Sequence, residues 1–320
     1  MNSNTKSSEN QSIRQSFGET IFKLAQNNPN LYVVSMDLKS SLYLTDFARK
    51  FPHRFVECGI AENNAAAIAA GLAKTGKTVF LCSFACFSPA INWAVIRQSI
   101  CYNNLNVKIV GSHAGLMTGD LGATHQMLED IAIMSSLSNM EVFSPIDAVE
   151  TQKITTILSR SRRPAYLRLV RQSTPILYDK KMSFTIGKSQ ILKKGKDITI
   201  IGHGPILNEA FEVQSQLLLQ KPNISLEIIN CSSIKPLDFE TIFKSIKKTG
   251  RLICLEDHQK NGGLGQMVAS QILASKFHPK FIHLAVDNQF GQSAKDYHQL
   301  YDNYNIGTKS LVSAIKKIYG

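Results

Sequence analysis

Long apolar segments are missing from this 320-residue chain. No run reaches the roughly eighteen apolar residues that a membrane-spanning helix needs, so a transmembrane protein is not indicated. The first eleven residues are polar and lack the apolar centre of a secretory signal. We expect residues 1–11 to form a flexible tail. We also expect the protein to be cytoplasmic and not associated with a membrane.

Cysteine pairs with metal-binding or redox spacing are also missing. The chain has six cysteines, but no Cys-x-x-Cys pair and no His/Cys cluster with zinc spacing. Most of them lie in apolar runs, as buried free thiols often do. We therefore expect no disulfide framework and no metal site formed by this chain: the cysteines are Cys58, Cys82, Cys86, Cys101, Cys231 and Cys254.

An excess of acidic residues is missing as well, since the formal net charge is +12 and the isoelectric point is about 9.4. The basic residues are scattered, and their short clusters at 160–163, 193–196 and 316–317 lack interleaved aromatic residues. This pattern favours a solvated surface over a nucleic-acid interface. A positively charged protein can also attract small anionic substrates.

Apolar runs that alternate with amphipathic stretches predict two α/β domains. We expect the first domain at 12–178, a linker at 179–188, and a smaller second domain at 189–320. Both domains are expected to be doubly wound, with a mainly parallel sheet in the first. The expected strands are 31–35, 78–82, 107–110, 141–143, 165–169, 198–201, 225–229, 251–255 and 281–284, and the expected helices are 13–27, 62–74, 89–102, 207–219, 237–248 and 265–275.

Glu62 is the first candidate for chemistry. It stands at the start of an alanine-rich helix, directly after a short strand and Gly59. An acid in the first turn of a helix commonly does no more than interact favourably with the helix dipole. Glu62 alone therefore leaves a structural and a functional interpretation open.

Further polar and aromatic residues follow the next strands. Phe84 and Phe87 come after one strand, and the glycine-rich segment 111–126 with His113 and His125 comes after another. In open α/β sheets, ligands bind beyond the carboxyl ends of the strands. The two phenyl rings could form a wall for a flat ring or could be core residues, and the two histidines could bind anions or move protons.

In order and spacing, these segments resemble the pyrimidine-binding domain of transketolases. The stretch 99–108 strongly resembles split bacterial and archaeal transketolases, in which two chains replace one. The resemblance covers nearly the whole chain beyond residue 12 and extends into the second domain, which resembles the transketolase C-terminal domain. The segments that carry it are 59–62, 83–87, 99–108, 113–115, 122–126, 128–132, 145–148, 167–172, 256–258 and 262–265.

The resemblance implies a thiamine-diphosphate-dependent enzyme that transfers a two-carbon ketol unit between phosphorylated sugars. It assigns Glu62 and His125 as catalytic residues, with Glu62 hydrogen-bonded to the aminopyrimidine ring so that the ring can take the proton from the thiazolium C2. It assigns Phe84, Phe87 and Asp37 to cofactor binding. It assigns the substrate, and above all its phosphate, to Arg14, Ser41, His113, His125 and Arg171.

Two departures from the family pattern matter. Gly119-Asp120-Leu121-Gly122 stands where the family usually reads Gly-Glu-Asp-Gly. The family aspartate meets a sugar hydroxyl, and a leucine cannot accept that hydrogen bond. We therefore expect a changed donor or acceptor, such as a deoxy, branched or otherwise modified sugar.

The second departure is the lack of the Gly-Asp-Gly motif and downstream Asn with which the family holds the cofactor diphosphate through a metal ion. Mg²⁺ (or Ca²⁺) is bound mainly by oxygen ligands of that kind. The resemblance therefore implies an N-terminal partner subunit that carries the motif, in an α2β2 assembly. This chain would be the C-terminal subunit.

Two other functions stay open. One is half of a deoxyxylulose-phosphate-synthase-like carboligase, against which the Asn-Leu-Asn-Val-Lys run at 104–108 and Arg171-Gln172 favour a transketolase. The other is a non-catalytic assembly subunit that has kept the fold. The presence of Glu62, Phe84 and the two histidines favours the catalytic interpretation.

Overall fold

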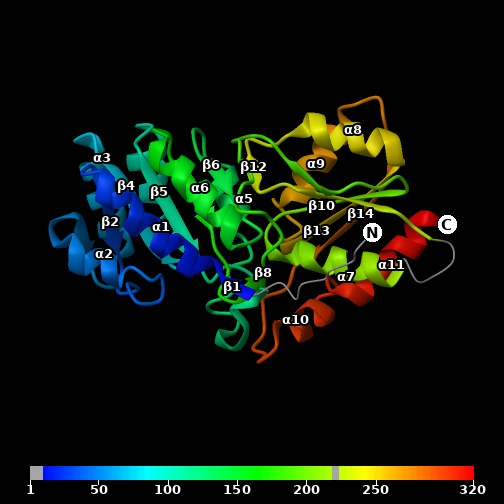
Figure 1. Cartoon of the computed structure of the whole chain (residues 1–320), viewed down its shortest axis with the longest axis horizontal. Helices are drawn as coiled ribbons and strands as arrows, with labels where there is room; N and C mark the ends of the chain where they lie inside the picture. Colours follow the sequence, from blue (N-terminus) through cyan, green and yellow to red (C-terminus); the bar gives the residue numbers. More distant parts are fainter. Residues whose placement is uncertain (1–9, 218–222) are drawn as a thin grey trace.

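The computed structural model describes residues 10–217 and 223–320, which form two α/β units side by side (Figure 1). The first unit contains a seven-stranded sheet in the order β12-β6-β7-β5-β4-β2-β3. All neighbours in it are parallel except β12, which runs antiparallel to β6. The strands are β2 (Leu31–Ser35), β3 (Phe55–Glu57), β4 (Thr78–Phe84), β5 (Val107–Ser112), β6 (Glu141–Phe143), β7 (Ala165–Arg168) and β12 (Ser233–Lys235).

Helices cover both faces of this sheet, because successive residues of a central strand point to opposite sides. In β4, Phe80 belongs to one core with helices α1 and α6, whereas Val79 and Leu81 belong to the other with α3 and α5. The helical elements are α1 (Ile13–Asn27), α2 (Thr45–Lys50), α3 (Glu62–Lys74), α4 (Trp93–Val95), α5 (Asp130–Ser135) and α6 (Ala148–Arg160), with short 3₁₀ segments at Pro52–Arg54 and Leu116–Leu121.

The second unit has the same design around a five-stranded sheet in the order β14-β13-β10-β11-β9, in which β9 alone is antiparallel. Helices α8 and α9 pack on one face, and α7 and α11 on the other. The elements are β9 (Gln190–Lys193), β10 (Ile198–Gly202), α7 (Asn208–Leu217), β11 (Leu226–Asn230), α8 (Phe239–Thr249), β13 (Arg251–Gln259), α9 (Leu264–Leu273), β14 (Lys280–Val286), α10 (Tyr297–Asn303) and α11 (Thr308–Tyr319), with a 3₁₀ turn at Pro205–Leu207. The prediction of two doubly wound α/β domains is confirmed.

The two units interlock through β12, which belongs to the second part of the chain but completes the edge of the first sheet. Beside it, the buried carboxylate of Glu150 on α6 accepts hydrogen bonds from Ser232 Oγ at 2.6 Å and Asn230 Nδ2 at 3.0 Å. Burial raises the pKa of Glu150 to about 7. The joint between the units is therefore an ordered, polar contact.

Two predicted boundaries are wrong. Residues 10 and 11 belong to β1 (Asn10–Ser12), which pairs with β8 (Ser173–Pro175), so they are not part of a tail. The rest of the predicted tail, residues 1–9, lies outside the described residues. The predicted helix at 89–102 begins only at Trp93, after turns that follow β4, and continues as a π-helical stretch at Ile96–Cys101.

Three further observations concern other predictions. The predicted helix at 207–219 corresponds to α7 up to Leu217, and residues 218–219 lie outside the described part of the chain. None of the helices in the described residues combines the length and the apolar character that crossing a lipid bilayer requires. All six cysteines are free thiols, four of them buried, as the sequence predicted.

Candidate active site

The predicted site residues follow the carboxyl ends of neighbouring parallel strands, which all meet at one edge of the first sheet. The reason is topological, because each parallel strand delivers its following loop to the same side. Asp37 and Ser41 follow β2, Glu62 follows β3, Phe84 and Phe87 lie at the end of β4, His113 follows β5, and Arg171 follows β7. His125 lies further along the loop after β5, and Arg14 lies in the first turn of α1.

Glu62 is buried, with 8% of its surface exposed, although it is the first residue of α3. The helix is capped by Ala61 without a side-chain hydrogen bond, so Glu62 does not act as a capping side chain. Its backbone carbonyl accepts a hydrogen bond from Asn92 Nδ2 at 3.0 Å, which ties the helix start to the loop after β4. Among the described residues, nothing donates a hydrogen bond to the Glu62 carboxylate or pairs with it. The carboxylate is therefore free to accept a hydrogen bond from a ligand that carries a donor group.

Four predicted residues form one aromatic cluster. The rings of Phe84 and Phe87 are nearly parallel, at 16°, with centroids 6.0 Å apart. The His113 ring lies 3.7 Å from Phe84, and the His125 ring meets Phe87 edge-on at 5.5 Å. Phe87 is the more exposed of the two phenyl rings, so it offers an aromatic face to a planar ligand.

His113 is held in an unusual conformation and kept neutral. Its backbone φ is 56°, in the left-handed region, and its carbonyl accepts a hydrogen bond from Thr118 Oγ1. Its Nδ1 lies 3.1 Å from Ser112 Oγ. Burial lowers the pKa of His113 to about 3, assisted by the positive charges of Arg14 and Arg171. His113 is therefore a neutral hydrogen-bonding group beside two fixed cations at pH 7.

This shift predicts a measurable loss of stability in acid. The unfolded imidazole binds a proton below a pKa near 6.5, whereas folded His113 binds one only near 3, so stability falls as pH drops below about 6.5. At about pH 5 this contribution amounts to about 2 kcal/mol. Asparagine tolerates a positive φ and has no imidazole to titrate. In His113→Asn, the fall in unfolding free energy between about pH 7.5 and pH 5 should therefore be about 2 kcal/mol smaller than in the unchanged chain. Denaturant titrations at both pH values test this. The same change at exposed His278 is the control, and an unchanged acid sensitivity in His113→Asn would contradict the assignment.

The cationic side of the site is built by Arg14 and Arg171. The Arg14 guanidinium donates to the carbonyl oxygens of Ser41 at 2.7 Å and Arg171 at 3.0 Å, so it joins the loops after β2 and β7. Arg171 donates to the carbonyl of Thr118 at 2.9 Å and forms an ion pair with Asp120. The hydrogen bond and charge of Arg171 lower the pKa of Asp120. The sequence did not single out Asp120 as a partner of Arg171.

Asp37 and Leu121 lie at the margin of this arrangement. Asp37 is exposed at a φ of 57°, and its N–H donates to the Glu57 carboxylate at 2.7 Å. No described contact joins Asp37 to the aromatic cluster or to the two arginines, so its predicted place near the cofactor remains a prediction. Leu121 is 37% exposed on the same loop as His113 and His125.

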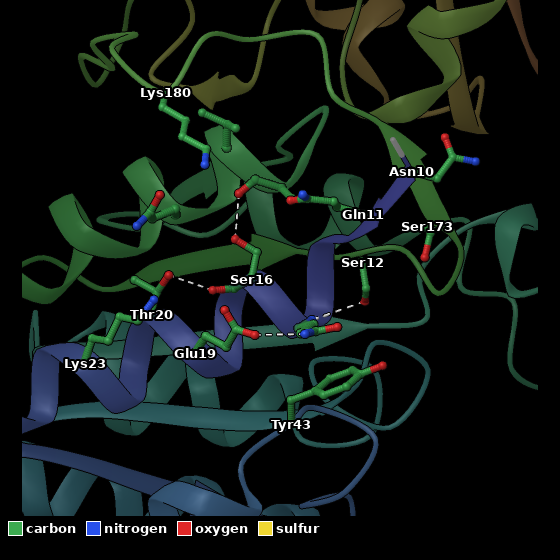
Figure 2. A pocket seen from close by; sticks show the side chains of 14 residues that line it. Asn10, Gln11, Ser12, Ser16, Glu19, Thr20, Lys23, Tyr43, Ser173 and Lys180 are labelled. Carbon is green, nitrogen blue, oxygen red and sulfur yellow. Dashed lines mark hydrogen bonds between the residues drawn. The ribbon is translucent and has the colours of Figure 1, made fainter. Parts of the chain in front are cut away.

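A pocket of about 650 Å³ lies elsewhere, along α1 (Figure 2). It contains none of the residues of the aromatic cluster, and several of its polar groups bond to one another or to nearby backbone. Thr20 donates to the Ser16 carbonyl, Ser16 donates to the Ala148 carbonyl, and Gln15 donates to Glu19. The strand-end cluster is the better candidate site, because it combines an aromatic wall, two histidines and two arginines with a carboxylate that has no partner among the described residues.

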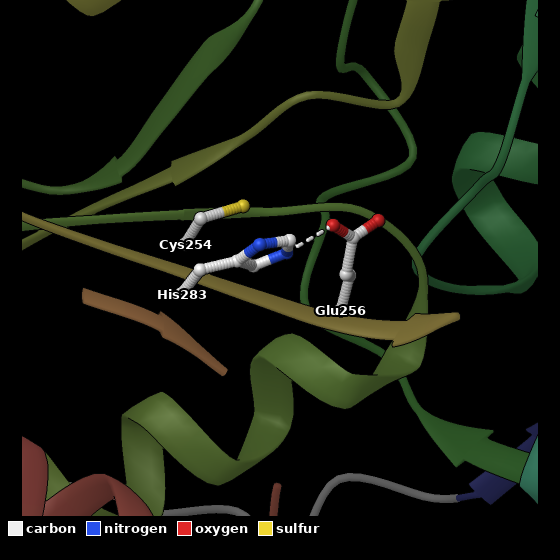
Figure 3. A group of neighbouring side chains, drawn as sticks. All are labelled: Cys254, Glu256 and His283. Carbon is white, nitrogen blue, oxygen red and sulfur yellow. Dashed lines mark hydrogen bonds and ion pairs between the residues drawn. The ribbon is translucent and has the colours of Figure 1, made fainter. Parts of the chain in front are cut away.

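A second group of reactive residues, Cys254, Glu256 and His283, lies in the second sheet (Figure 3). The Glu256 carboxylate accepts hydrogen bonds from the N–H groups of Leu264 at 2.8 Å and Gly265 at 2.9 Å, and from His283 Nε2 at 2.6 Å. Although burial raises the pKa of Glu256, the nearby His203 and the hydrogen bond from His283 hold that pKa well below its usual range. Because donors already surround both carboxylate oxygens, this group anchors the start of α9 rather than offering ligands to a cation.

Comparison with known proteins gives one consistent result. Residues 9–176 match the family model "Transketolase, pyrimidine binding domain", and residues 187–311 match "Transketolase, C-terminal domain". A protein of Methanocaldococcus jannaschii, provisionally named a transketolase C-terminal section, is 39% identical over 305 residues, with 95% of both chains covered. One of the subunits of the apulose-4-phosphate transketolase of Phocaeicola vulgatus is 36% identical, with 93% of this chain and 94% of that protein covered.

A solved structure supports the same match. It is described as a split-gene transketolase in an inactive β4 tetramer. It is 35% identical in sequence and covers 97% of this chain and 99% of its own, with a TM-score of 0.87.

Proposed function

The chain belongs to the transketolase family and corresponds to the C-terminal subunit of its split members, and we propose that it is the catalytic C-terminal subunit of a two-chain enzyme that transfers a two-carbon ketol unit between phosphorylated sugars. The observation that carries this proposal is Glu62, a residue only 8% exposed whose carboxylate has no partner among the described residues, at the strand ends that also present the aromatic cluster. An assembly subunit without catalytic function has no need for a carboxylate left without a partner beside an aromatic wall.

The chain's residues fit one side of thiamine diphosphate, which supplies the carbanion chemistry when bound. We propose that Glu62 shares a proton with a ring nitrogen, in surroundings whose low exposure to water would strengthen that hydrogen bond. Phe87, with Phe84 behind it, fits the flat pyrimidine ring and excludes water from the bond. We propose that His125, which meets Phe87 edge-on, donates a proton to a substrate oxygen.

The cationic side of the site fits the phosphate end of the substrate. Arg14 and Arg171 are fixed by backbone carbonyls, so their guanidinium groups are oriented before an anion arrives. Neutral His113 can donate a hydrogen bond without adding charge. We propose that these three residues and Ser41 bind the phosphate, and that Asp37 lies at the cofactor end of the site.

The other side of the cofactor must come from a second chain. The sequence has no Gly-Asp-Gly motif with a downstream Asn. Relatives that cover the same length are named as a C-terminal section or as one subunit of a transketolase. We therefore propose an N-terminal partner subunit that holds Mg²⁺ (or Ca²⁺) and the diphosphate, in an α2β2 enzyme.

Leu121 directs the choice of sugar. One relative is named for apulose 4-phosphate, so family members of this length can act on unusual sugars. We propose that the complex prefers a donor or acceptor that lacks an ordinary hydroxyl group opposite Leu121. Such a sugar does not lose a hydrogen bond there.

The test is a comparison of donors by the reconstituted two-chain complex. We expect poor turnover of xylulose 5-phosphate, and we expect Leu121→Asp to raise kcat/KM for it by about 10- to 100-fold, the value of one hydrogen bond to a charged group. Leu273→Asp, at an exposed leucine of α9, is the matched control. Turnover of xylulose 5-phosphate equal to that of ordinary transketolases would contradict the role of Leu121, and no ketol transfer from any phosphorylated ketose would contradict the proposed function.

A further inference from the structure

The loop from His113 to His125 needs external support. Besides both histidines it carries Asp120 and Leu121, and it contains several residues with positive φ: His113, Gly115, Gly119 and Gly122. A free backbone of this kind can adopt many conformations, because glycine has no side chain to restrict its φ and ψ angles. Something outside the loop has to select one of them.

The second domain holds the beginning of the loop through Asp257 at the end of β13. The Asp257 carboxylate, 3% exposed, accepts the N–H of Leu116 through both oxygens, at 2.9 and 3.1 Å. Tyr301 Oη donates to the same carboxylate at 3.3 Å. Gly115 leaves the room for this contact, because a Cβ at that position would lie 2.3 Å from Asp257 Oδ2. Leu116 is only three residues from His113.

The second domain holds the end of the loop through residues 291–294. Gln126, next to His125 and 4% exposed, donates through Nε2 to the carbonyl oxygens of Gln292 at 2.8 Å and Gly119 at 3.0 Å. Gly291 packs so closely that a Cβ there would lie 1.7 Å from Gln126 Oε1. A Cβ on Gly122 would likewise lie 2.5 Å from Ser293 Oγ.

We infer that Asp257 and the segment 291–294 of the second domain are positioning residues for the substrate loop 113–126. They act by fixing where His113, Asp120 and His125 stand relative to Arg171 and Phe87. This inference rests on the proposed function only where it predicts a change in kcat/KM. It gives the second domain a defined task in a reaction whose predicted residues all lie in the first domain.

Gly291→Ala is the most direct test. Its new methyl group meets Gln126 Oε1, so Gln126 must leave its two carbonyl partners and release His125. In the complex with the partner subunit we expect kcat/KM for the phosphorylated acceptor to fall about 10- to 100-fold, because small displacements of positioned groups cost rates of that order. Thiamine diphosphate affinity should stay within about twofold, since Glu62 and Phe87 lie outside the loop. Gly71→Ala is the matched control, because nothing lies within 4 Å of its Cβ.

A second variant keeps the test valid if Gly291→Ala folds poorly. Asp257→Asn keeps the volume and removes the charged acceptor of Leu116, with Asp287→Asn at an exposed position of the same domain as control. We expect Asp257→Asn to move the ring proton resonances of His113 in the full chain alone. Gly291→Ala should likewise move those of His125. In the double variant Gln126→Ala/Gly291→Ala, the second change should add nothing to the first, because the clashing amide is gone.

The outcomes separate the two proposals. Shifted histidine resonances in a chain whose complex shows no ketol transfer would support the positioning role and contradict the proposed function. Unchanged resonances and an unchanged kcat/KM in both variants would overturn the positioning role. A lower melting temperature without any change at His113 or His125 would also overturn it, because the contacts would then hold the domains together and nothing more.

Discussion

Glu62→Gln is expected to lower kcat of the reconstituted complex by about 100- to 10,000-fold, the usual contribution of a positioned acid or base. Glutamine has nearly the same shape as glutamate, so the buried position stays filled. It carries no negative charge and cannot stabilise a shared proton on a ring nitrogen. Because the Glu62 carboxylate has no partner among the described residues, removing its charge breaks no contact, and the melting temperature of the chain should stay about the same.

The control for this variant is Glu240→Gln. Glu240 also lies in the first turn of a helix, α8, but its side chain is 86% exposed. If Glu62 were simply an acid that interacts with a helix dipole, the two variants would behave alike, with small effects on stability and none on turnover. Undiminished turnover in Glu62→Gln would favour the interpretation as a non-catalytic assembly subunit.

Several elements could be predicted from the sequence because local physics determines them. The helix at 13–27 shows an amphipathic period and a Ser12 cap that accepts from the Gln15 N–H, and the structure has the same bounds. The strand at 31–35 and the helix at 62–74 also have their predicted bounds. Buried parallel strands are continuous apolar runs, and such runs are visible without knowledge of their partners.

The joint between the domains could not be predicted in this way. The strand β12 is three residues long and carries no periodic signal, and it forms only because the edge strand β6 is available to it. The hydrogen bond between Leu116 and Asp257 joins residues 141 positions apart. No local pattern reveals such a contact, so the support of the substrate loop by the second domain became visible only in the folded chain.

The site lies between these two cases. The rule that ligands bind beyond the ends of parallel strands led to Phe84, Phe87, His113 and His125, and the structure brings these four together. The sequence could not show that Asp120 pairs with Arg171, because that contact depends on how two loops meet. Nor could it show that the Glu62 carboxylate has no partner among the described residues, the property on which its proposed role depends.

Dependence on a second chain should give the largest effect of all. The aromatic cluster lies outside the 650 Å³ pocket along α1, and the sequence lacks the Gly-Asp-Gly motif, so the chain alone should hold thiamine diphosphate too weakly for turnover.

The central claim is therefore tested most directly by one titration. Ketol transfer between phosphorylated sugars is measured at a fixed concentration of this chain, with thiamine diphosphate and Mg²⁺, while an N-terminal transketolase subunit is added. The account predicts no transfer by either chain alone and a rate that rises until the two chains are equimolar, with Glu62→Gln inactive throughout. Full turnover by this chain without the second subunit, or by the second subunit without this chain, would contradict it.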